Sequence, residues 1–140
     1  MNALTLEQAV DKIESAYEFM LAYAAQGRDF ESAGGDGPPV RGMLNDLRGA
    51  LTALAPAFEV AIGAVDISQR EALSSFCRLL AADAERALAA LNVVISARNI
   101  SSQLVDNLNA SMHLRTLLTD MFLLDEALSA ASRSAPRASR

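Results

Sequence analysis

The sequence predicts an all-α protein, and three observations carry this prediction. Hydrophobic residues make up 51% of the 140 residues, but aromatic residues only 5%, with no tryptophan, and alanine and leucine dominate. Strand-rich domains need more aromatic and β-branched residues and more frequent turns. Apolar residues recur at spacings of three and four, the period of an amphipathic helix. No glycine or proline interrupts the stretch from Ala64 to Ser134. We therefore expect an antiparallel four-helix bundle over residues 1–131, followed by a flexible basic tail over 132–140.

The first helix is expected over residues 5–27. Thr5 and Gln8 have the spacing of a capping box, and Gly27 suits the position just past a helix end. The apolar seam consists of Leu6, Val10, Ile13, Tyr17, Met20 and Ala24. Phe19, Leu21 and Tyr23 lie off that seam, so the last two turns are apolar over much of their circumference. Such a helix is either deeply buried or has a second partner.

A glycine- and proline-rich segment follows at residues 28–39 and predicts a loop. About 12 residues is long for a connection between helices. A flexible crossover is the simpler interpretation, and a functional loop is the alternative. The segment contains no lysine of the kind that a phosphate-binding loop requires.

The second helix is expected over residues 40–65, with Pro56 inside it. A proline removes one backbone hydrogen bond and clashes with the preceding turn, so we expect a kink or a break near Leu54 and Ala55. The seam continues past the proline, which favours two roughly collinear pieces. Its members are Val40, Leu44, Leu47, Leu51, Leu54, Phe58, Ile62 and Val65.

The third helix, over residues 68–97, is predicted to open with a second capping box at Ser68 and Glu71. Its apolar stripe is Leu73, Phe76, Leu80, Ala84, Ala87, Leu91 and Val94. The polar run from Ser96 to Asn99 predicts a turn, with one uninterrupted long helix as the alternative. The fourth helix is expected over residues 99–130.

The two sides of this fourth helix follow from 100° of rotation per residue. The apolar side is Ile100, Leu104, Leu108, Ser111, Leu118 and Phe122, and the polar side is Ser102, Asp106, Asn109, His113, Thr116 and Asp120. Arg115 falls at the centre of the apolar side, with Asn107 and Glu126 flanking it. A buried guanidinium is costly without a partner. We therefore expect Arg115 to be at least half buried and bonded to a carboxylate or to helix-end carbonyls of another helix or subunit.

Charge and hydropathy exclude several function classes. The net charge of −5 and the pI of about 4.8 argue against binding to nucleic acid or to an anionic membrane surface. No run of about 18 uncharged apolar residues is present, which argues against membrane insertion. The N-terminal residues lack the basic start of a secretory signal, so the expected location is the cytoplasm. The single cysteine, Cys77, permits no intrachain disulfide.

The catalytic inventory predicts no enzyme, no cofactor and no metal site. There is one histidine and one cysteine, and the Glu-x-x-His pattern of di-iron bundles and the common nucleotide-binding and hydrolase motifs do not occur. Cys77 is interpreted as a small buried hydrophobic residue. For His113 three interpretations stay open: a solvated face, a partner-binding polar face, or a phosphoacceptor. The candidate residues of that polar face are Asp106, Asn109, His113 and Asp120.

The leading functional hypothesis is a non-enzymatic protein-interaction module, such as a small regulator, adaptor or assembly factor, that acts through exposed apolar helix faces. The expected architecture is similar to that of the small helical flagellar export chaperones, which gives a secretion-type chaperone as the second hypothesis. A small-molecule-binding bundle is the third. The wide apolar arcs predict a homodimer or a constitutive complex with another protein. The interface candidates are Phe19, Leu21, Tyr23, Asn107, Leu114, Arg115, Leu117, Met121 and Leu124.

Overall fold

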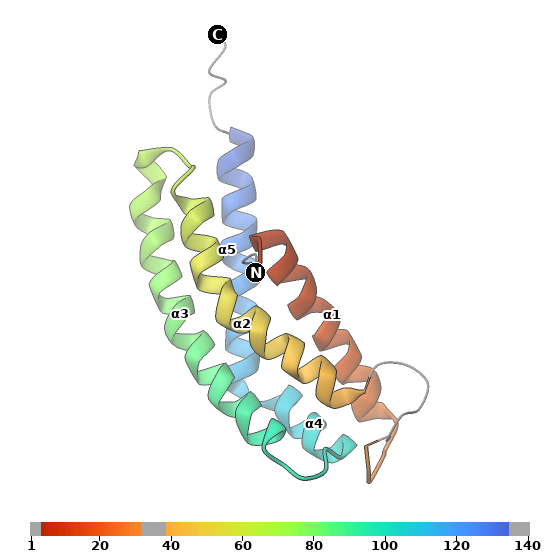
Figure 1. Cartoon of the computed structure of the whole chain (residues 1–140). Helices are drawn as coiled ribbons and strands as arrows, with labels where there is room; N and C mark the ends of the chain where they lie inside the picture. Colours follow the sequence, from red (N-terminus) through yellow and green to blue (C-terminus); the bar gives the residue numbers. More distant parts are fainter. Residues whose placement is uncertain (1–3, 32–38, 135–140) are drawn as a thin grey trace.

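The computed structural model describes residues 4–31 and 39–134, and within these ranges it is helical without any strand. The all-α prediction is confirmed, but residues 4–31 and 39–134 contain five helices instead of the four expected. They are α1 (Leu6–Ala25), α2 (Val40–Ile62), α3 (Ile67–Ile95), α4 (Ser102–Ala110) and α5 (Met112–Ser134). Figure 1 shows the long helices α1, α2, α3 and α5 gathered side by side, with the short α4 at one end. None of the helices in the described ranges has the length and apolarity needed to cross a membrane.

Both ends of α1 form as the sequence predicts. The Thr5 hydroxyl accepts a hydrogen bond from the Gln8 backbone N–H, and the Gln8 side chain accepts one from the Thr5 N–H, which completes the capping box. Gly27 follows the C-terminal cap with φ of +63°, the left-handed conformation that glycine adopts without strain.

We expect Gly27→Ala to lower the free energy of unfolding by about 1 kcal/mol, because alanine is strained at positive φ. No atom lies within 4 Å of the added methyl group, so the cost comes from the backbone alone. Gly49→Ala is the matched control, since Gly49 lies inside α2 with equally open surroundings and there alanine should stabilise. Urea denaturation measures both. Equal effects of the two variants would refute the backbone explanation.

A break in α2 and a capping box at the start of α3 were predicted, and neither occurs. α2 continues without a break through Pro56, because the proline is exposed and water can reach the carbonyl group that loses its partner. The kink expected as the alternative to a break stays a prediction. Buried Leu54 and Phe58 on either side hold both halves on the same core. α3 begins at Ile67 without a capping box, and the Ser68 hydroxyl instead bonds the carboxylate of Asp66 at 2.7 Å.

The C-terminal part differs most from the sequence-based expectation. The turn after α3 is confirmed, but the single helix expected over 99–130 is divided at Ser111, whose ψ of 128° is extended. This interruption changes the direction and the phase of every face that follows. α5 then runs to Ser134, past the expected end of the bundle at residue 131, whereas residues 135–140 of the predicted tail lie outside the described ranges.

The packing leaves one side of the bundle open. α1 packs on α2 and α4, α2 packs on α3, and α3 packs on α5, whereas α1 and α5 make almost no close backbone contact. The core between these helices is largely aliphatic, with two buried aromatic side chains, Tyr23 and Phe58, among the described residues. Its largest fully buried members are Phe58, Ile13, Met20, Leu44, Leu47, Leu51, Leu54, Leu80, Leu91, Ile100, Leu114 and Leu117.

Candidate functional site

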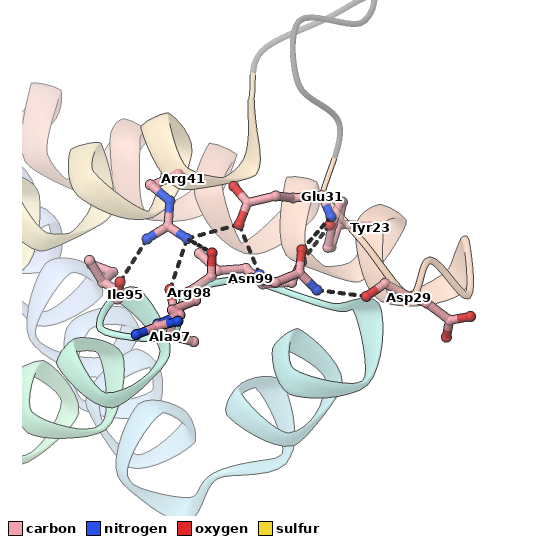
Figure 2. Close-up of polar contacts among 9 residues, drawn as sticks. Tyr23, Asp29, Glu31, Arg41, Ile95, Ala97, Arg98 and Asn99 are labelled. Atoms are coloured by element: carbon pink, nitrogen blue, oxygen red, sulfur yellow. Dashed lines mark hydrogen bonds and ion pairs between the residues drawn. The ribbon is translucent and has the colours of Figure 1, made fainter.

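A polar network joins the end of α1 to the connection between α3 and α4 (Figure 2). Arg41, in the first turn of α2, donates to the backbone carbonyls of Ile95 at 2.7 Å and Ala97 at 2.9 Å. The same guanidinium pairs with the Glu31 carboxylate at 2.8 Å. This bond from Arg41 lowers the pKa of Glu31, assisted by the N–H of Ile100 and opposed by burial. Arg41 thus satisfies carbonyls that the C-terminus of α3 leaves without helical partners.

The other half of the network clamps the segment that follows α1. The Asn99 side chain accepts from the Glu31 N–H at 2.9 Å and donates to the Asp29 carbonyl at 2.7 Å. The Ser102 hydroxyl accepts from the Arg28 N–H and donates to the Tyr23 carbonyl. These groups are satisfied by one another, so the network is a structural joint that offers no obvious group to a ligand.

A pair of carboxyl groups lies between α3 and α5. Asp120 is only 8% exposed, although it was predicted on a solvated polar side, and it shares a hydrogen bond with Asp83. Burial, followed by the bond and the charge of Asp83, raises the pKa of Asp120 to about 7. The Asp83 carboxylate also pairs with Arg86, whose Nη1 lies 2.8 Å from Oδ1 of Asp83. At low pH the pair therefore holds a proton between two helices.

Most of the predicted interface residues belong to the core of this chain. Leu114, Leu117, Met121 and Leu124 are essentially inaccessible on α5, and the Tyr23 hydroxyl donates to the Ile100 carbonyl at 2.6 Å inside the protein. Phe19 is half-buried and stacks on Tyr23, with ring centroids 6.1 Å apart. Leu21 alone of the apolar candidates is exposed. The apolar width that predicted an interface is therefore largely used by intramolecular packing.

The division of the predicted helix at Ser111 also places several polar candidates differently from the expectation. Arg115 is exposed, and no acceptor bonds its guanidinium among the described residues, so the expected partner is absent. Asn107 is exposed and accepts a bond from the Gln103 amide. Asp106 and His113 are exposed, as a solvated face requires. Asn109 is buried, and its amide has no hydrogen-bond partner within the described part of the chain.

The open side of the bundle carries a groove, which we call the α1–α5 groove. It consists of two adjoining hollows of about 470 Å³ each, which share Leu6 and Asp125. The first is completed by Glu7, Val10, Asp11 and Glu14 of α1, and the second by Ala61, Leu128, Ser129, Ser132 and Arg133. The groove thus runs along α1 and continues beyond its N-terminus over α5 and the end of α2.

The groove combines an apolar floor with an acidic rim. Val10 and Leu128 are 8% and 6% exposed and form part of the floor. The rim carries Glu7, Asp11 and Glu14 on one side of α1, at spacings of four and three residues. Opposite them, burial raises the pKa of Asp125, and the charges of Glu126 and Asp11 raise it further.

Sequence reasoning missed both acidic features. The spacing of Glu7, Asp11 and Glu14 is visible in the sequence and marks one helix face, but nothing local shows that this face borders a groove. The pairing of Asp83 with Asp120 has no sequence signal, because the two residues are 37 positions apart on helices that meet only in the fold. No trio of side chains suited to hold a metal ion occurs in the ranges that the structure describes.

Comparison of the chain with family models, with curated proteins and with solved structures gives no match.

Proposed function

We propose that this chain is a non-enzymatic protein-interaction module, a small regulator, adaptor or assembly factor, whose docking surface is the α1–α5 groove. One observation carries the proposal: the helices pack in the order α1, α2, α3, α5, whereas α5 and α1 make almost no close backbone contact and the α1–α5 groove lies between them. Helical bundles bury their apolar stripes by closing on themselves or on a neighbour. An open side with an apolar floor is where a further element packs.

One exposed apolar side chain supports the same surface. Phe122 is 50% exposed and precedes Asp125 by three residues, so it lies on the side of α5 that borders the groove. Leu21, 48% exposed, lies farther along α1 and lines a different hollow, together with Ser102 and Asp106 of α4. Exposed aromatic side chains beside a groove are a typical feature of binding surfaces.

A photo-crosslinking amino acid at Ser129, which lines the groove, tests the proposal in cells that make the protein. Ser75, exposed on α3, is the matched control position. We expect a covalent adduct with another polypeptide at Ser129 and none at Ser75, resolved by mass spectrometry. Adducts of equal yield at both positions, or none at either, would contradict a docking role for the groove.

A further inference from the structure

The charge around the groove identifies the chemistry of its occupant. We propose that the α1–α5 groove binds a cationic amphipathic helix supplied by a different protein, an inference that rests on the proposed interaction function and specifies the partner. The apolar floor, the acidic rim and the helical walls of the groove each restrict the kind of segment that can bind there.

The floor requires an apolar stripe on the occupant. Leu6 is shared by the two hollows, and Val10 and Leu128 extend the apolar surface in opposite directions along the groove. Val10 and Leu128 belong to the edge of the core and Leu6 packs against it, and the two hollows lie over them between α1 and α5. A partner that buries leucine-like side chains there would complete the ring of helices.

The rim requires positive charge on the same occupant. The hollow beside α1 is lined by four carboxylates, those of Glu7, Asp11, Glu14 and Asp125, and by no basic group. In the adjoining hollow Arg133 is engaged with Glu126 at 3.1 Å. Cationic side chains would offset the charges of Glu126 and Asp11, which, after burial, raise the pKa of Asp125. A second copy of this chain is disfavoured, because its own net charge is −5.

The walls favour a helix over an extended segment. Both are helices, whose backbone groups are already bonded, so they offer no free edge to pair with an extended peptide. A helix satisfies its own backbone and needs only side-chain contacts. The acidic residues of α1 repeat over about 10 Å, two helical turns, which matches lysines or arginines at heptad spacing on a neighbouring helix.

The test measures binding of a labelled synthetic helix of about 18 residues, with leucines at heptad spacing and lysines on the flanking positions, by fluorescence anisotropy. The first comparison peptide has the same composition but places leucine at every second position. The second keeps the heptad spacing of leucine and carries glutamate in place of lysine. The groove variant combines Glu7→Gln, Asp11→Asn and Glu14→Gln. The matched control combines Asp46→Asn, Glu59→Gln and Glu85→Gln, three exposed acidic residues elsewhere, with the same change in net charge.

We expect the heptad lysine peptide to bind the wild type and both comparison peptides to bind at least tenfold more weakly. The groove variant should lose about fivefold or more in affinity and part of the salt dependence, whereas the control should change less than twofold. Equal losses in the two variants would show attraction by net charge alone and overturn the proposal, as would tighter binding of the glutamate peptide. An adduct at Ser129 together with no peptide binding would reject the cationic helix while leaving the interaction function intact.

Discussion

Replacing Asp120 by asparagine is expected to raise the free energy of unfolding at pH 8.5 by about 1–3 kcal/mol, with a much smaller effect at pH 4. In the wild type the folded-state pKa of Asp120 is about 7, above the value of 3.8 for an unperturbed aspartate. The folded protein therefore holds more protons than the unfolded chain between these two values. The contribution of Asp120 to the free energy of unfolding is therefore fully present at low pH and is lost as the pH rises toward 7.

The asparagine variant removes this loss because an amide has nearly the shape of a carboxyl group and donates to Asp83 at every pH. Urea denaturation of both proteins from pH 4 to pH 8.5 measures the difference. Asp46→Asn, at an exposed position on α2, is the matched control and should leave the pH dependence unchanged. Asp125, whose pKa is also raised, leaves a residual slope of the same sign in the variant. A variant as pH-dependent as the wild type would refute the shared proton.

Arg41→Met is expected to lower the free energy of unfolding by about 1–3 kcal/mol at pH 7. The substitution keeps the aliphatic stem but removes the donors to Ile95, Ala97 and Glu31. It leaves two carbonyls at the end of α3 and a carboxylate, 22% exposed, without their partner. Arg48→Met is the matched control from the same helix, because Arg48 bonds only exposed amide side chains and should cost a few tenths of a kcal/mol.

The pH dependence separates the contribution of Glu31 from that of the carbonyls. Arg41 lowers the folded-state pKa of Glu31, so this ion pair stabilises the protein above the ordinary glutamate pKa of about 4.5. That part is lost as the pH falls through the lower folded-state value. The penalty of Arg41→Met should therefore be larger at pH 7 than at pH 3, as chemical denaturation at the two values would measure. A penalty that grows toward low pH would contradict the role of the pair.

The helical elements before residue 96 were predictable because their signals are local. Alternation of three and four residues marked the buried positions of α1, α2 and α3, and the Thr5 capping box and Gly27 set the limits of α1. Pro56 left a kink and a break open as alternatives, because whether a proline interrupts a helix depends on what lies beside it. Here the proline faces solvent while its neighbours are anchored in the core.

The polar features were not predictable, since a helical wheel assumes an uninterrupted helix. The extended backbone at Ser111 divides the expected helix, and this single residue explains why Arg115 is exposed and Asp120 buried. A serine between two good helix formers carries too weak a local preference to reveal the break. The orientation of α5 after Ser111 depends on its packing against α3, which is a contact between residues distant in the sequence.

The sequence by itself determined an acidic, all-helical chain with a leucine- and alanine-rich core, because composition and period are properties of neighbouring residues. Only the tertiary structure decided which apolar surface stays unburied, since that depends on which helices meet. Leu114 and Leu117, which were predicted to lie in an interface with a partner, are buried between α5 and the rest of the bundle. The face of α1 that bears Glu7 and Asp11 became the border of a groove because α5 packs on α3 and makes almost no close backbone contact with α1.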